Sequence, residues 1–241
     1  MAMTFQRARS QQQREARQQA ILAAAAVMLT EMPVAQVSLN ELSRRAGLAK
    51  SNVLRYFESR EAVLLELLDV AWRSWLDRLA TELDAAVPGR ATADERVNQV
   101  ADALAGSLAA EPVLCDLLNA QAAVLERNVS PQVAARYKRM ALANVAALGA
   151  LLARQLPGLG QQDAFRLSGA VLMMTAALWP HTQPSAAMLA AYQADPELAA
   201  MRLDFRTTLG EAAALLIRGQ LARPRRRAPR SPGLARGGAL G

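Results

Sequence analysis

Helical spacing of the apolar residues constrains the fold of this chain more than any other sequence feature. Between Arg60 and Ala86 the large apolar side chains follow one another in steps of four, four, three, four and four residues. They are Leu64, Leu68, Trp72, Trp75, Leu79 and Leu83. Such steps keep side chains on one face of an α-helix, and no strand-like alternation is sustained between turn signals. The sequence therefore predicts an all-α fold.

Prolines, glycines and capping residues divide this pattern into separate helices. We expect long helices at about residues 12–31, 60–86, 93–110, 112–128, 131–155, 162–178 and 196–222, and short ones at 38–45, 49–56 and 185–192. Pro33 and Gly47 stand at two of the breaks. Ser38 and Glu41 have the spacing of a capping box, in which each side chain binds the other's backbone N–H.

Composition narrows the class of protein. The 241 residues are 52% apolar and 20% charged, which predicts a soluble globular chain with a sizeable core. Neither a bilayer-spanning apolar stretch nor the ordered features of a signal peptide is present, so we expect a cytoplasmic location and no membrane partner. The single Cys115 and single His181 exclude an internal disulfide and a structural zinc site, and we predict no cofactor.

The charge is unevenly distributed. Residues 1–60 carry nine basic and four acidic residues, a net +5, whereas residues 61–217 carry 12 basic and 17 acidic residues, a net −5. Seven arginines and no acidic residue follow in 218–241. We call residues 1–60 the basic head and residues 61–217 the acidic body. This distribution favours a polyanion as the partner of the basic head, and the alternative is that the basic residues only form a solvated surface.

Residues 38–64 have the pattern of a helix-turn-helix. A capped helix of two turns, a glycine-containing turn and a second short helix form the unit that places one helix in the DNA major groove. The second helix is rich in hydrogen-bonding side chains: Lys50, Ser51, Asn52, Arg55 and Tyr56. An ordinary helical hairpin with a solvated outer face is the alternative for this pattern alone.

Residues 14–68 resemble the TetR (tetracycline-repressor) family of transcriptional regulators, because several motifs agree in order. They are the alanine-rich segment Ile21–Ala26, a Ser-capped helix, the turn Ala46-Gly47, the recognition helix, the pair Tyr56-Phe57 and the triplet Ser59-Arg60-Glu61. Three positions depart from the family pattern. Met32-Pro33 stands where the family often has glycine after the first helix. Ala49 replaces the usual hydroxyl cap of the recognition helix, and Leu54 replaces a common aromatic residue that contacts phosphate.

The resemblance implies which residues meet DNA. Lys50, Ser51, Asn52 and Arg55 are expected to face the groove, and Ser38, Tyr56 and Arg60 to approach the backbone. Asn52 suits adenine, and Arg55 or Lys50 suits guanine. Ser38, Tyr56 and Arg60 each have an alternative role without DNA. Ser38 could only cap its helix, Tyr56 could only pack under the turn, and Arg60 could only begin the next helix.

The resemblance also implies the rest of the organisation. We expect a flexible basic N-terminus (1–11), a DNA-binding domain (12–59), a ligand-binding and dimerisation domain (60–222) and a disordered Arg/Pro/Gly-rich tail (223–241). The helices at 162–178 and 196–222 carry more apolar surface than one bundle buries easily, which favours a homodimer, with an inward-folded monomer as the alternative. Candidate contacts for a small apolar or amphipathic effector are Trp75, Cys115, Met173, Met174, Leu178 and Trp179, each of which could instead be plain core.

Two other classes of function fit less well. An enzyme would need a phosphate-binding loop or a recognisable nucleophile and base, and neither motif is present. A helical adaptor or membrane-surface protein could use the basic residues on anionic partners, but the chain lacks a strongly basic amphipathic helix. The sequence therefore predicts a ligand-responsive DNA-binding regulator, most often a repressor in the family that it resembles.

Overall fold

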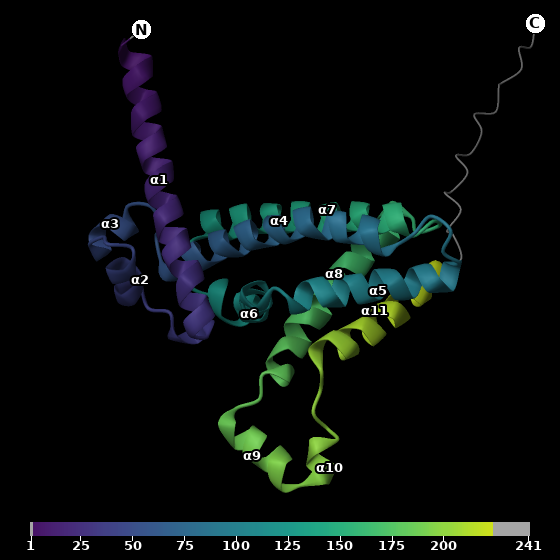
Figure 1. Ribbon diagram of the computed structural model, residues 1–241. Helices are drawn as coiled ribbons and strands as arrows, with labels where there is room; N and C mark the ends of the chain where they lie inside the picture. Colours follow the sequence, from purple (N-terminus) through teal and green to yellow (C-terminus); the bar gives the residue numbers. More distant parts are fainter. Residues whose placement is uncertain (1, 224–241) are drawn as a thin grey trace, which may run out of the picture.

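The computed structural model describes residues 2–223, and the side chains of residues 11–223. This part of the chain is built from helices and contains no β-strand, so the predicted all-α fold is confirmed (Figure 1). The α-helices are α1 (Ala2–Glu31), α2 (Leu39–Arg45), α3 (Lys50–Leu54), α4 (Arg60–Ala86), α5 (Ala93–Ala109), α6 (Pro112–Ala120), α7 (Pro131–Gln155), α8 (Gln161–Leu178), α9 (Ala186–Ala194), α10 (Pro196–Ala199) and α11 (Phe205–Leu221). Short helical turns form η1 (Val34–Gln36), η2 (Gln121–Leu125) and η3 (Trp179–Thr182).

Side-chain caps explain where several helices begin. Ser59 accepts a hydrogen bond from the Ala62 N–H at the start of α4. Thr92 and Glu95 form a complete capping box at α5. The capping box expected at α2 is only half formed: Ser38 accepts from the Glu41 N–H, but the Glu41 carboxylate binds arginines instead.

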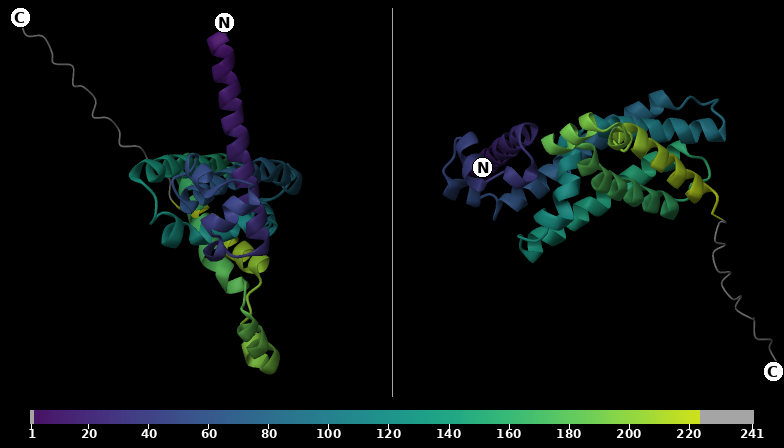
Figure 2. Two further views of the ribbon diagram at one scale, coloured as in Figure 1. Left: turned by 90° about the vertical axis from the view of Figure 1, so that its left-hand side faces the viewer. Right: turned by 90° about the horizontal axis from the view of Figure 1, so that it is seen from below.

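The helices form a smaller N-terminal end and a larger body. Helices α1, α2 and α3 lie at one end, where α1 projects beyond its neighbours (Figures 1 and 2). In the body, α4 and α7 run side by side, α5 pairs with α11, and α8 packs against both α7 and α11. Helix α4 joins the two parts, because it packs against α1 as well as α5, α6 and α7.

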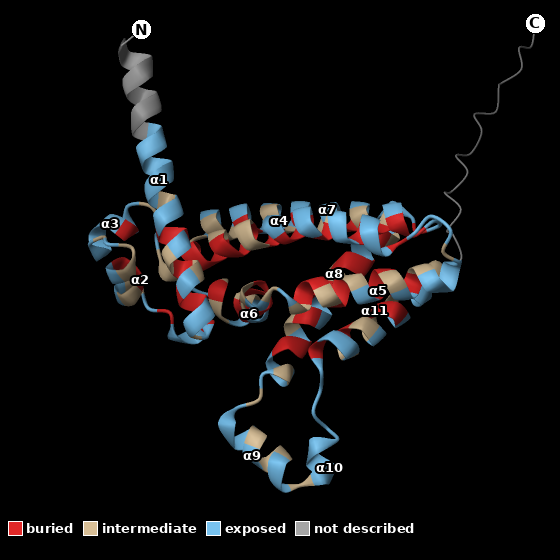
Figure 3. Cartoon of the chain, viewed as in Figure 1, coloured by how far each residue is buried: buried red, intermediate tan, exposed pale blue. Residues whose placement is uncertain are grey.

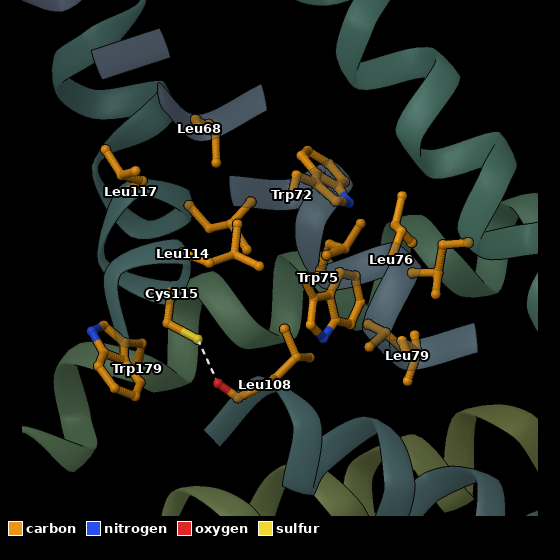
Figure 4. Close-up of a cluster of buried hydrophobic side chains, with 14 of the residues drawn as sticks. Leu68, Trp72, Trp75, Leu76, Leu79, Leu108, Leu114, Cys115, Leu117 and Trp179 are labelled. Atoms are coloured by element: carbon orange, nitrogen blue, oxygen red, sulfur yellow. Dashed lines mark hydrogen bonds between the residues drawn. The ribbon is translucent and has the colours of Figure 1, made fainter. Parts of the chain in front are cut away.

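The core of the body is mostly apolar. Leu68, Trp72, Trp75, Leu76 and Leu79 of α4 meet side chains from α5, α6 and η3 (Figure 4). Trp75 is 1% exposed, and its Nε1 donates to the Ser107 hydroxyl at 3.1 Å. Burial of this aromatic face of α4 stabilises the bundle and fixes the position of the helix.

The predicted start of the first helix, at about residue 12, is wrong, because α1 already begins at Ala2 and residues 2–11 are helical. The interval from Ala2 to Ala20 contains neither glycine nor proline and is rich in Gln, Arg and Ala, which favour a helix. The predicted disordered tail, 223–241, lies outside the described residues except for Arg223.

The helix predicted at 196–222 is also wrong, because it is two helices. Helix α10 ends at Ala199, and α11 begins after Asp204, whose carboxylate accepts from the Thr207 N–H at 2.8 Å. Met201, expected on the apolar stripe of a long helix, lies in the break and is 69% exposed. The helix predicted at 112–128 is similarly divided, into α6 and the π-helical turn η2.

Within residues 2–223, no single helix is both long and apolar enough to cross a membrane. Helix α5 and the following segment Pro112–Leu125 pass that test by length and composition only when they are taken together, and their axes are bent by 87° relative to each other.

We predict that Cys115 makes the protein less stable at alkaline pH. Its thiol is buried, donates to the Leu108 carbonyl oxygen at 3.3 Å, and burial raises its pKa from 9.0 to about 12. The folded state then holds a proton that the unfolded state loses above pH 9, so this stability is present below about pH 9 and is lost as the pH rises towards 12. Denaturation of wild type and Cys115→Ala between pH 8 and 11 measures it; equal slopes for both proteins would contradict the prediction.

Candidate nucleic-acid interface

The turn between α2 and α3 is fixed by backbone geometry. Gly47 has a φ of 63°, a left-handed conformation that side chains disfavour. The Leu48 N–H donates to the Ser43 carbonyl oxygen at 2.9 Å and closes the turn. A residue with a Cβ at position 47 would be strained by this φ, although the space around it is open. The predicted helix-turn-helix is therefore present in the structure.

Helix α3 is anchored by one face and exposes the other. Val53 is fully buried, and Phe57, just beyond α3, is 5% exposed. Four polar residues that the sequence predicts for DNA contact are all exposed: Lys50, Ser51, Asn52 and Arg55. Ala49 caps α3 without a side-chain hydrogen bond, as its sequence predicts. The arrangement presents a rigid polar surface of the width that a major groove admits.

The three predicted backbone contacts have intramolecular roles. The Ser38 hydroxyl caps α2, accepting from Glu41 N at 3.1 Å, although the residue itself is exposed. Tyr56 is half-buried below α3. The Arg60 guanidinium donates to the Val37 carbonyl oxygen at 2.6 Å and to Glu61 at 2.9 Å, so it joins α4 to the segment before α2.

A carboxylate network holds α2 against α1. Glu41 accepts from both Arg44 and Arg45, and Arg45 also reaches Glu31 at the end of α1. The hydrogen bond from Arg44, followed by that from Arg45, lowers the pKa of Glu41 to about 2. These two arginines of the basic head are therefore neutralised within the protein.

A polar cleft between α1 and α3 adds residues that the sequence interpretation did not place in the site. It has a volume of about 830 Å³, and Arg14, Arg17, Asn52, Arg55 and Tyr56 are among its lining residues. None of its described lining residues is acidic. Arg17 follows Arg14 by three residues, and the buried Ile21 follows Arg17 by four. This helical spacing puts both arginines on one face of α1 and could have identified them from the sequence.

Hydrogen bonds connect this end of the molecule to the body. Asp116 of α6 accepts from the Val34 N–H at 3.1 Å. Glu58 accepts from the N–H of Ser130, the N-cap of α7, at 2.6 Å. Both carboxylates therefore bind backbone groups across the junction.

The structure does not bring the six candidate effector residues together. Trp75, Cys115, Leu178 and Trp179 are buried, but Met173 is 69% and Met174 39% exposed. The two methionines therefore lie at the surface of the described chain, apart from the four buried candidates. Trp179 lines a separate pocket of about 380 Å³ with residues of the loop before α11.

Two small polar residues explain why α8 turns its methionines outwards. Ser168 and Thr175 are fully buried, and their hydroxyls donate to the helix's own carbonyl oxygens at Ala164 and Val171. A hydroxyl satisfied in this way can be buried without a partner on another helix. Because Ser168 and Thr175 lie on the buried side of α8, the distribution of apolar residues along this helix does not show which side faces the core.

Comparison with known proteins gives two family matches. The model of bacterial regulatory proteins of the tetR family matches residues 21–67. The model of the tetracyclin repressor-like C-terminal domain matches residues 69–224. Together they cover the helix-turn-helix and the body.

Individual relatives agree. The HTH-type transcriptional regulator EthR of Mycobacterium tuberculosis is 45% identical over 53 residues, which are 22% of this chain and only 24% of EthR. The fold resembles that of FadR from Bacillus subtilis, solved in complex with stearoyl-CoA, at a TM-score of 0.51 and 15% identity over 83% of this chain and 96% of that one. A TetR transcriptional regulator from Rhodococcus sp. RHA1 gives a TM-score of 0.51 and 15% identity over 84% and 96%.

The helix-turn-helix and these matches define a DNA-binding transcriptional regulator, not an enzyme. The chain belongs to the TetR family. Regulators of this family bind operator DNA as dimers and respond to small-molecule ligands.

We predict that Arg60→Ala destabilises the folded protein even without DNA. It removes a charged donor from the Val37 carbonyl oxygen, a bond worth about 1.5–3 kcal/mol where fully buried and less here, because the Arg60 side chain is 24% exposed. Urea denaturation should show a loss of about 1 kcal/mol. Arg139→Ala, an exposed arginine of α7, is the control, and an equal loss in both variants would refute the structural role.

Proposed function

We propose that this chain is a ligand-responsive repressor that binds a palindromic operator as a homodimer and is released by a small apolar or amphipathic molecule. The observation that supports it is the polar surface of α3, where Lys50, Ser51, Asn52 and Arg55 are exposed on a helix anchored by buried Val53. Asn52 and Arg55 have the groups for bidentate contacts with adenine and guanine. Ser38, Tyr56 and Arg60 are proposed as backbone contacts secondary to their intramolecular roles.

The cleft between α1 and α3 extends this surface. Arg14 and Arg17 face the same opening as Arg55, so a DNA strand beside α3 would pass cations from two helices. Phosphate contacts position a protein on DNA, whereas base contacts give specificity. We assign Arg14 and Arg17 to the first role and Arg55 to the second.

We also propose a division of labour along the chain. Residues 12–59 form the DNA-binding unit, and residues 60–222 form the ligand-binding and dimerisation unit. Exposed apolar residues of α8 and α11, Met174 and Leu215, support a dimer through these helices. A twofold dimer would match a palindromic site whose half-sites lie about one helical turn, or a multiple of it, apart.

The effector would act in the body between α4 and α7. The Trp72 Nε1 and Tyr137 hydroxyl, one from each helix, are buried and have no hydrogen-bond partner among the described residues. Leaving such groups unpaired costs about 1–3 kcal/mol each, so a ligand that supplied a partner would be favoured there. Trp75, Cys115, Leu178 and Trp179 then shape the surrounding core.

An effector at this position would be thermodynamically coupled to DNA. Calorimetry tests the coupling, because effector and operator must weaken each other's binding by the same factor. Independent binding would exclude a ligand-responsive regulator.

We predict that Arg55→Ala and Arg17→Ala affect DNA binding differently. Selection from a random duplex pool should first give a palindromic consensus. On that site Arg55→Ala should cost about 1–3 kcal/mol and relax one base position. Arg17→Ala should weaken selected and random DNA alike and reduce the salt dependence of log K by about one unit.

Arg139→Ala serves as the charge-matched control for both variants, because Arg139 lies on α7 and should leave the affinity unchanged. Equal losses on selected and random DNA for Arg55→Ala would contradict its role as a base contact. Failure to select any consensus would contradict the repressor proposal itself.

We predict that the carboxylates of Asp116 and Glu58 couple the DNA-binding unit to the body. The double variant Asp116→Ala, Glu58→Ala loses both hydrogen bonds across the junction. Hydrogen exchange should then be faster in residues 34–57 and unchanged in α5. Glu66→Ala, which breaks only a partly exposed ion pair with Arg136, is the matched control. If residues 34–57 exchange at the same rate in the wild type, the double variant and this control, the two hydrogen bonds do not couple the units.

A further inference from the structure

The segment between η3 and α11, residues 183–204, forms an arm that projects away from the body (Figures 1 and 2). It contains α9 and α10, which pack against each other, and neither helix has a buried residue. Figure 3 shows the arm as exposed or intermediate throughout its two helices. Its base is fixed, because the rings of Trp179 and Phe205 meet edge to face at 5.1 Å where the two ends of the arm leave the body.

The helices of the arm are too short to be stable by themselves. Helix α9 has nine residues and α10 has four, whereas an isolated helix in water needs roughly 12–15 residues to be even marginally stable. Tertiary burial normally supplies the missing stability, and within the described part of the chain neither helix has a buried residue. A surface outside the described residues would supply it.

The chemistry of the arm selects a protein surface with apolar groups. Helix α9 carries no charged residue. The exposed large apolar residues of the arm are Met188, Leu198, Met201 and Leu203. Residues 183–204 contain three acidic residues and one arginine, a net −2, which opposes binding to DNA or to an anionic lipid surface.

A second copy of this chain offers a matching surface. Leu142 of α7 and Phe165 and Met173 of α8 are also exposed. Helix α7 contains four basic residues and no acidic one, and Arg136, Lys138 and Arg154 pair with carboxylates of the same chain, so this face is not acidic and does not repel the acidic arm. Eight of the eleven large apolar residues exposed in the described part of the chain thus lie either on the arm or on α7 and α8.

We propose that the arm of each protomer docks on the outer face of α7 and α8 of the partner subunit, and so clasps the homodimer. The inference rests on the homodimer of the proposed function, and it adds that the arm of each subunit contacts the partner subunit. Twofold symmetry applies the contact twice, so two arms and two α7–α8 faces are covered without a third molecule. The arm also continues from α8 through η3, which makes this face contiguous with the proposed dimer helices.

Cysteine cross-linking tests the contact directly. Cys115 is fully buried, so cysteines introduced on the surface are the reactive ones. Two differently tagged full-length chains, one carrying Met188→Cys and the other Met173→Cys, are co-expressed and treated with a short bismaleimide at low protein concentration. We expect a covalent heterodimer. Met188→Cys paired with Asp77→Cys, an exposed residue of α4, is the control and should give little product.

The outcomes separate this proposal from the proposed function. A dimer by light scattering that gives no more Met188–Met173 product than the control overturns the arm contact and leaves the homodimer intact. A monomer at all concentrations overturns both.

A second pair of variants measures the contribution of the arm to dimer affinity. Met188→Glu with Met201→Glu places charges on residues that are 46% and 69% exposed in the monomer, so folding should be unaffected and circular dichroism checks it. We expect the dimer Kd to rise at least about tenfold, as for desolvated apolar contacts at an interface. Gln193→Glu adds a charge to an exposed polar residue of the same arm and should change Kd little. Equal Kd values for the two proteins would overturn the proposal.

Discussion

The buried face of α4 is the constraint on which the rest of the structure depends. This helix begins at Ser59 and Arg60 beside the helix-turn-helix and continues without a break into the body. At 1.5 Å per residue its 27 residues span about 40 Å. Because α1 packs near its start and α5, α6 and α7 pack along it, α4 connects the body to α1, and through α1 and α2 to α3.

Buried polar groups add specificity to this apolar packing. Asn144 of α7 donates to the Asp69 carboxylate at 2.8 Å inside the bundle, and Asp69 is also paired with Arg73. A buried carboxylate without such partners would be costly, so the pair favours one register of α7 on α4. Asp116 and Glu58 act similarly at the junction, where each accepts from a backbone N–H.

How much the sequence could predict differs between elements for physical reasons. The bounds of α4 and α7 were predicted correctly, because each has a serine cap, a long apolar stripe and a clear stop. The division at 200–204 was missed, since alanine-rich sequence favours a helix wherever tertiary contacts do not decide otherwise. The exposed residues of α3 followed from a local motif, whereas the exposure of Met173 depends on how α8 packs against its neighbours.

The charge of the N-terminal region illustrates the same limit and clarifies the DNA site. Arg44, Arg45 and Arg60 are engaged within the protein, so the net +5 of residues 1–60 overstates the charge available to DNA. The low pKa of Glu41, about 2, keeps that carboxylate ionised and its arginines paired until the pH falls well below 4.5. In the proposed complex with DNA, the cations of α1 and α3 therefore matter more than the total charge of residues 1–60. Arg44 and Arg45, paired with Glu41, help to hold α2 against α1.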